Sequence, residues 1–160
     1  MMQIDLYCIG KIKEKYLKQG MDEYLKRLSA YAKVKVHELA DEATSENLSD
    51  QEKILLLEKE AQRLSNHLDR KSKIVVLAIE GELLSSEQMA QQLDHFATYG
   101  SSKISFIIGG SLGLSEEIKK QADVSWSLGR ITLPHQLIRL VLLEQIYRVF
   151  RIDSGHAYHK

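Results

Sequence analysis

The chain has 160 residues, a length typical of one domain with its own hydrophobic core. Hydrophobic residues make up 44% of it, charged residues 28%, and the formal net charge is zero, which excludes a strongly basic protein that coats nucleic acid over its whole surface. No apolar run approaches the roughly 18 residues of a membrane helix, and the N-terminus lacks the pattern of a secretory signal. We therefore expect a cytoplasmic protein that does not bind a membrane.

Short strands and longer helices are predicted to alternate along the chain. Residues 73–81 contain an unbroken apolar run, which predicts a central strand buried on both faces. Ser49 and Ser85 are each followed three residues later by Glu or Gln, a spacing typical of capping boxes at helix starts. This order predicts an α/β domain over residues 1–160, with a mostly parallel sheet and helices on both faces. The predicted strands are residues 4–9, 34–39, 73–81, 104–108 and 124–128, and the predicted helices are residues 11–31, 49–68, 85–99, 115–122 and 134–152.

Charge is distributed unevenly along this order. Residues 1–36 carry eight Lys or Arg side chains against four acidic ones, whereas residues 37–69 carry nine acidic side chains against three basic ones. Local basic patches could therefore contact RNA although the net charge is zero. Lysines near the start could bind RNA phosphates, and a solvated helix face explains them equally well; they are Lys11, Lys13, Lys15 and Lys18.

Two predicted strands end in glycine close to the start of a helix. Gly109 follows residues 104–108, and Gly129 follows residues 124–128. The carboxyl ends of parallel strands share one edge of the sheet, where ligands bind in open α/β folds. The segment 109–113 lacks both phosphate-loop patterns, so it is either a tight turn that needs positive φ or a place where the backbone approaches a ligand.

The mostly apolar segment 129–134 leads into the last predicted helix. Its backbone N–H and C=O groups could cradle a flat ring such as adenine, or it is a buried connection whose backbone groups are satisfied internally. In the helix, His135 and Arg139 share a face, as do Glu144 and Arg148, which can pair. Because this helix is apolar most of the way round, we expect it to form a homodimer interface.

The helix start and the tail each leave two interpretations open. His135 either caps the helix or acts in catalysis. Residues 154–160 are either a frayed end or a segment that orders on a substrate, in which Tyr158 would stack on a base and His159 and Lys160 would meet phosphate. No cluster of His, Cys and Asp has metal-ligand spacing, so we expect no metal site.

Four stretches together resemble a known family. They are IGKIKEKY near the start, FIIGGSLGL, WSLGRITLPHQLIRLVLLEQIYRVFRI and the terminal AYHK. Jointly they are similar to the small SPOUT-class methyltransferases of the ribosomal RNA large subunit methyltransferase H family, over the whole chain. The resemblance implies a homodimer whose α/β sheet has a deep trefoil knot in its C-terminal part, a rare exception to the rule that chains do not thread, with the cofactor site at the knot.

The resemblance also implies an activity. The methyl donor would be S-adenosylmethionine, and the acceptor would be N3 of a pseudouridine in large-subunit (23S) ribosomal RNA, methylated on assembled ribosomes. Two alternatives stand beside it: a SPOUT methyltransferase that acts on tRNA, and a non-catalytic α/β module that binds a ribosome or a nucleotide. Cofactor-dependent thermal stabilisation would distinguish an enzyme from such a module.

Cofactor contacts follow from the resemblance position by position. The last strand commonly reads S-F-S or S-L-S in the family, whereas Ser127-Leu128-Gly129 stands here. If the contacts are made by the backbone, the glycine should be tolerated. The implied contacts are Leu77, Gly109, Leu128, Gly129, Arg130, Ile131, Thr132 and Leu133.

Catalytic roles are hypotheses on the same basis. The sulfonium methyl is already activated, so the enzyme mainly needs in-line geometry, but N3–H must lose its proton. Arg139 would stabilise the developing anion, and His135 would accept the proton directly or through water. Tyr158 and His159 would position the nucleotide, reaching across the dimer.

Overall fold

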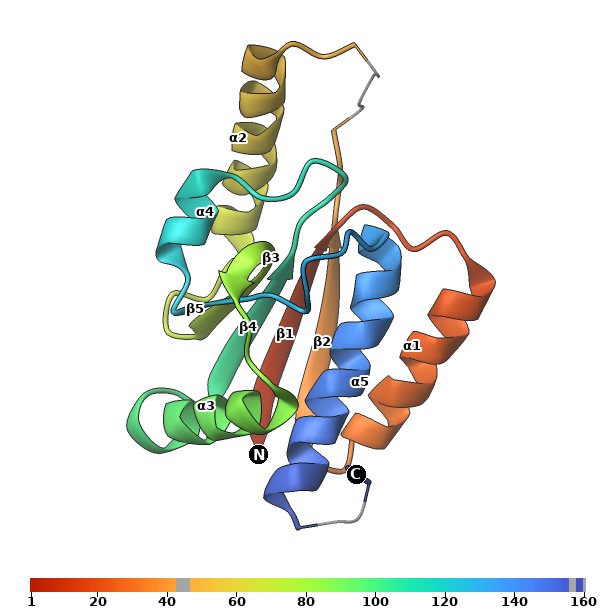
Figure 1. Ribbon diagram of the computed structural model, residues 1–160, viewed down its shortest axis with the longest axis vertical. Coiled ribbons are helices and arrows are strands. Elements are labelled where there is room, and N and C mark those ends of the chain that lie inside the picture. Colours follow the sequence, from red (N-terminus) through yellow and green to blue (C-terminus); the bar gives the residue numbers. More distant parts are fainter. Residues whose placement is uncertain (43–46, 156–157, 160) are drawn as a thin grey trace.

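The computed structural model describes residues 1–42, 47–155 and 158–159. Strands and helices alternate through these residues in the predicted order (Figure 1). The strands are β1 (Met2–Ile9), β2 (Ala32–Leu39), β3 (Lys73–Glu82), β4 (Lys103–Ile108) and β5 (Val124–Trp126), and the helices are α1 (Lys15–Leu28), α2 (Asp50–His67), α3 (Ser86–Tyr99), α4 (Glu116–Gln121) and α5 (His135–Asp153).

The strands lie parallel in one sheet with the order β2-β1-β4-β3-β5. Helices α1, α3 and α5 pack on one face of the sheet, and α2 and α4 pack on the other (Figure 1). The predicted α/β fold with helices on both faces is therefore confirmed. β3 lies between two strands, and its Ile74, Val75 and Val76 are buried, as its apolar run predicts.

The starts of α2 and α3 are the predicted capping boxes. Ser49 Oγ accepts from Glu52 N at 3.1 Å, and Ser49 N donates to Glu52 Oε1 at 3.4 Å. Ser85 and Gln88 make the same reciprocal pair at 3.1 and 2.8 Å. Each box satisfies two backbone donors that a helix start otherwise leaves without partners.

α1 begins at Lys15, later than the helix predicted from residue 11. Ile12 N donates to Glu38 Oε2 at 2.6 Å, and Lys13 N donates to Gln136 Oε1 at 3.0 Å. Because side chains from β2 and α5 take these donors, residues 11–14 form a non-helical connection. No sequence-local signal announces such long-range acceptors.

β5 is shorter than predicted, because β3 bulges beside it. Leu77 and Glu82 both pair with Trp126, so residues 78–81 leave the ladder. Beyond the bulge, Ser127 N donates to Glu82 O at 2.8 Å. The end of β3 therefore folds against the chain that leaves β5.

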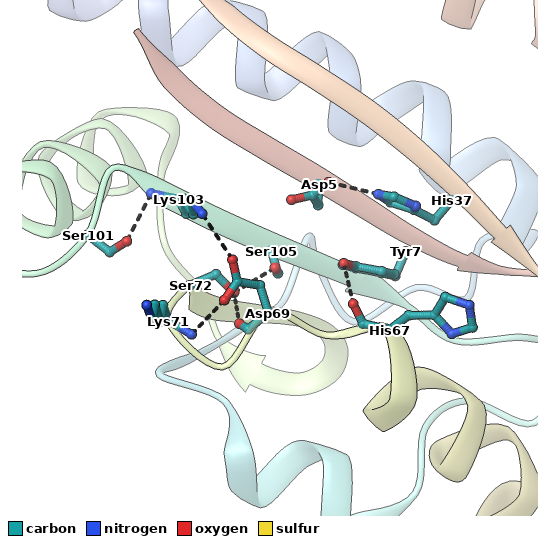
Figure 2. Close-up of polar contacts among 10 residues, drawn as sticks. All are labelled: Asp5, Tyr7, His37, His67, Asp69, Lys71, Ser72, Ser101, Lys103 and Ser105. Carbon is teal, nitrogen blue, oxygen red and sulfur yellow. Dashed lines mark hydrogen bonds and ion pairs between the residues drawn. The ribbon is translucent and has the colours of Figure 1, made fainter.

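The face of the sheet on which α2 packs also carries polar side chains, in the middle of β1 and β2 and before the start of β3. Asp5 Oδ1 lies 2.7 Å from His37 Nε2, and the hydroxyls of the buried residues Ser72 and Ser105 lie 2.8 Å from each other (Figure 2). These contacts join β1 to β2, and β4 to the connection before β3.

Candidate active site

A cavity of about 230 Å³ opens at the carboxyl ends of β3, β4 and β5. Five segments form its wall: the end of β3 with its bulge, the turn after β4, Lys119 of α4, the connection after β5 and the start of α5. The cavity is mostly apolar, with a few polar groups, as expected of a small-molecule site. Of the predicted cofactor contacts, the structure brings Leu77, Gly109, Leu128, Gly129, Ile131, Thr132 and Leu133 to this wall.

The turn after β4 needs its glycines for conformational reasons. Gly113 has φ +83°, and its N–H donates to Gly110 O at 3.0 Å. A Cβ on Gly109 would lie 2.4 Å from Gly113 O, so no side chain fits there. The turn is therefore tight, and it also forms one wall of the cavity.

The connection after β5 lines the cavity with Leu128, Gly129 and residues 131–133. Among the described residues, the N–H groups of residues 130–133 donate to no protein acceptor, so an internally satisfied connection is not what the described part of the chain shows. Gly129 has φ +134°, which a serine would adopt only with strain, and a Cβ on it would meet no atom within 4 Å. The glycine therefore suits this backbone better than the serine common in the family.

Arg130 is the one predicted cofactor contact that does not line the cavity. Its side chain is exposed, and its NH1 donates to the carbonyl oxygens of Ile79 and, at 3.3 Å, Gly81. It therefore ties the connection after β5 to the bulge of β3, which fixes two walls of the cavity relative to each other.

His135 lines the cavity at the first residue of α5. Burial lowers the pKa of its imidazole, nearby Arg139 and Lys13 lower it further, and Asp41 opposes them. The imidazole is therefore neutral at pH 7, the form that accepts a proton. His135 also lines a smaller cleft with Asp41 and Glu60.

Arg139 lies outside the cavity wall and is fully buried. Its NH2 donates to Ile9 O at 3.0 Å and Gly10 O at 2.8 Å, and its NH1 donates to Glu38 Oε2 at 2.9 Å. The hypothesis that Arg139 stabilises an anion needs a guanidinium free to meet substrate, and this one already holds the end of β1. In this structure the Arg139 guanidinium is bonded to the end of β1 and to Glu38.

Tyr158 and His159 lie far from the cavity of their own chain. Tyr158 donates to Glu144 Oε1 at 3.3 Å, and the ring of His159 contacts Arg148 and Glu87. At 1.5 Å rise per residue, Arg148 lies about 20 Å along α5 from the cavity end of the helix. A single chain therefore does not bring Tyr158 or His159 to His135. The predicted pair of Glu144 and Arg148 is present, with Oε1 and NH2 2.6 Å apart.

Several groups at the site carry no signal in the sequence. Lys119 Nζ and Glu80 Oε1, 2.5 Å apart, pair across the cavity wall from α4 to the β3 bulge. Glu60 is a buried carboxyl whose pKa is raised, mainly by burial. Each depends on helix placement over the sheet, and a local pattern of residues does not reveal that placement.

Within the described ranges, no group of three or more His, Cys, Asp or Glu side chains could hold a metal ion. No helix in that part of the chain is long and apolar enough to cross a membrane.

Similarity to known proteins identifies the class of protein to which this fold, with its cavity at the carboxyl ends of the strands, belongs. The family model described as "Predicted SPOUT methyltransferase" matches residues 2–159. A solved structure titled as a probable methylase family protein from Haemophilus influenzae Rd KW20 aligns with a TM-score of 0.55, 11% identity, 98% of this chain and 70% of that one. That likeness supports the fold alone.

Curated relatives narrow the class. The chain is 58% identical to Ribosomal RNA large subunit methyltransferase H of Bacillus cytotoxicus over 99% of this chain and 100% of the relative. It is 57% identical to the protein of the same name from Bacillus thuringiensis, with the same coverage. The chain therefore belongs to the ribosomal RNA large subunit methyltransferase H family of SPOUT methyltransferases.

Proposed function

We propose that this protein transfers a methyl group from S-adenosylmethionine to N3 of a pseudouridine in 23S ribosomal RNA, on assembled ribosomes in the cytoplasm. The observation that carries the proposal is the cavity between the glycine turn and the connection after β5, in a chain whose relatives are named as large-subunit ribosomal RNA methyltransferases.

The cavity suits a nucleoside cofactor. Leu77, Leu128 and Ile131 offer apolar surface to a flat ring, and the N–H groups of residues 130–133, which donate to no described protein acceptor, can meet the edge of that ring. When bound, S-adenosylmethionine supplies an activated methyl group. The chain then has to orient the donor, exclude water and receive the acceptor nitrogen in line.

His135 is the residue we assign to the proton. The N3 proton must leave as the bond from N3 to the methyl carbon forms, and the neutral imidazole of His135 lies on the cavity wall to accept it. Arg139 acts indirectly, because it holds Ile9 and Gly10 next to the first turn of α5.

A trefoil knot remains part of the proposal. It is supported by the way the β3 bulge closes over the chain that leaves β5: Trp126 Nε1 donates to Leu84 O at 3.0 Å, and Arg130 reaches back to Ile79 and Gly81. These contacts join the segments that a C-terminal knot of this class would draw together.

We also propose a homodimer. Leu83 and Ile131 are 59% and 71% exposed beside the cavity, and the side chain of Val141 on α5 is only half-buried, which leaves apolar surface for a second copy. Because Tyr158 and His159 lie far from their own cavity, a partner subunit would have to supply them to this site. No metal takes part in the proposed reaction.

Cofactor binding is the first test. S-adenosylmethionine in hundredfold excess over its dissociation constant should add about 2.7 kcal/mol to the free energy of unfolding, seen as a thermal shift that ATP does not reproduce. A protein that binds ribosomes but shows no such shift would be a non-catalytic module. Methyl transfer to tRNA instead of ribosomes would contradict the proposed substrate.

A further inference from the structure

Residues 10–16, which comprise the connection between β1 and α1 and the first two residues of α1, form a basic edge, here called the basic lip. In Figure 1 it arches from the carboxyl end of β1 over the start of α5 and into α1. It carries Lys11, Lys13 and Lys15, followed by Tyr16, whose side chain is 66% exposed. The sequence alone left these lysines equally explained by a solvated helix face, but Lys11 and Lys13 are not in a helix.

Side chains from two other elements fix the lip backbone. Glu38 on β2 accepts from Ile12 N at 2.6 Å. Gln136 on α5 accepts from Lys13 N at 3.0 Å and donates to Lys11 O at 3.2 Å. Three consecutive residues are thus held by side chains more than twenty positions away in sequence.

Arg139 completes this clamp. It donates to Gly10 O and pairs with the same Glu38 carboxylate that holds Ile12. Burying a guanidinium is costly unless it is paired and hydrogen-bonded, and its Nε finds no partner among the described residues. These contacts stabilise the buried guanidinium, which in turn holds the lip backbone in place.

The lip presents free positive charge at the site. Among the described residues, the ion pairs of this region are Lys18 with Asp22 and Arg139 with Glu38, so Lys11, Lys13 and Lys15 have no acidic partner there, and all three are exposed. Lysines beside a helix start oppose the helix dipole, so helix stability does not explain them.

The lip also lies next to the reacting end of the cavity. Gln136, which holds it, directly follows His135 on the cavity wall. An RNA strand whose nucleotide enters the cavity would therefore pass close to the lysines of the lip.

We propose that the basic lip binds the RNA strand that flanks the target nucleotide, with Lys11 and Lys13 on its phosphates and Tyr16 stacked on an unpaired base. This inference rests on the proposed function, because it names how that substrate is held. Exposed ammonium groups beside an exposed aromatic ring are the combination that binds single-stranded RNA. A fixed backbone lowers the entropy lost on binding.

The test removes the charge without touching the cavity. In Lys11→Gln/Lys13→Gln, affinity for 70S ribosomes from cells lacking the protein should fall about tenfold at ~0.1 M salt, and the slope of log affinity against log salt should fall by about 1.4. S-adenosylmethionine affinity should not change. The control, Lys26→Gln/Lys71→Gln, removes the same charge from exposed sites outside the lip and should leave ribosome affinity as in wild type.

Two variants test the ring and the clamp separately. Tyr16→Ala should weaken ribosome binding about fivefold or more, whereas Tyr16→Phe keeps the stacking face and should not. Gln136→Met removes two backbone contacts but no charge, so it should weaken binding and leave the salt slope unchanged.

The possible outcomes distinguish a failure of the lip proposal from a failure of the proposed function. Suppose that the wild type methylates ribosomes, and that Lys11→Gln/Lys13→Gln binds them as tightly as Lys26→Gln/Lys71→Gln does. The lip proposal is then overturned, and the proposed function stands. If wild type binds ribosomes but transfers no methyl group, the proposed function is overturned, and the ribosome affinities still decide the lip. A wild type that does not bind ribosomes overturns both.

Discussion

Arg139 offers the sharpest separation between a catalytic and a positioning role. In Arg139→Ala, the carbonyls of Ile9 and Gly10 lose their donor inside the domain, at about 1–3 kcal/mol each. Glu38 loses less, because its side chain is 32% exposed and still accepts from Ile12 N. We therefore expect the free energy of unfolding to fall by about 3–5 kcal/mol.

The assay is urea unfolding followed by circular dichroism at one fixed protein concentration, since a dimer's stability depends on concentration. A loss of this size corresponds to a Tm lower by roughly 10 °C for a chain of this length. The matched control is Arg148→Ala on the same helix, whose partly exposed pair with Glu144 should contribute only about 0.3–0.5 kcal/mol. An Arg139→Ala protein of wild-type stability that has lost only the chemical step would refute the positioning role.

Three further predictions concern the cavity. His135 has a lowered pKa in the folded state, so the unfolded chain binds more protons in acid. The free energy of unfolding of the wild type should therefore fall as the pH drops below about 6.5 and level off below the native pKa. In urea unfolding, His135→Gln should lose less of its free energy of unfolding between pH 7.5 and pH 5 than the wild type does. Gly109→Ala would force its Cβ to 2.4 Å from Gly113 O, so calorimetry should show a loss of about 3 kcal/mol; an unchanged Tm would mean the turn is looser than described. Ile131→Asp changes an exposed wall residue, so stability should shift by less than about 0.5 kcal/mol while the thermal shift with S-adenosylmethionine shrinks; a full shift would place the cofactor elsewhere.

Local signals in the sequence predicted much of the fold and the place of the site. Ser49 and Ser85 mark helix starts because a capping box acts within four residues. Gly109 and Gly129 mark the carboxyl edge because parallel strands bring their ends together, and both line the cavity.

What the sequence missed depends on contacts between distant residues. Helical spacing predicts that Arg139 lies near His135, but it does not predict the direction of the guanidinium. The end of β1 and Glu38 determine that direction. The late start of α1 has the same cause, since Gln136 takes the N–H of Lys13. Tyr158 contacts Glu144, which lies 14 positions earlier in the chain, and no local pattern indicates that contact.

The measurement that tests the central claim most directly is methyl transfer from labelled S-adenosylmethionine to 70S ribosomes and separated subunits from cells lacking this protein. The account predicts label in large-subunit RNA, at N3 of one pseudouridine, with 70S ribosomes as the better substrate. Label confined to tRNA, or no label in ribosomal RNA under conditions where the protein binds S-adenosylmethionine, would contradict it.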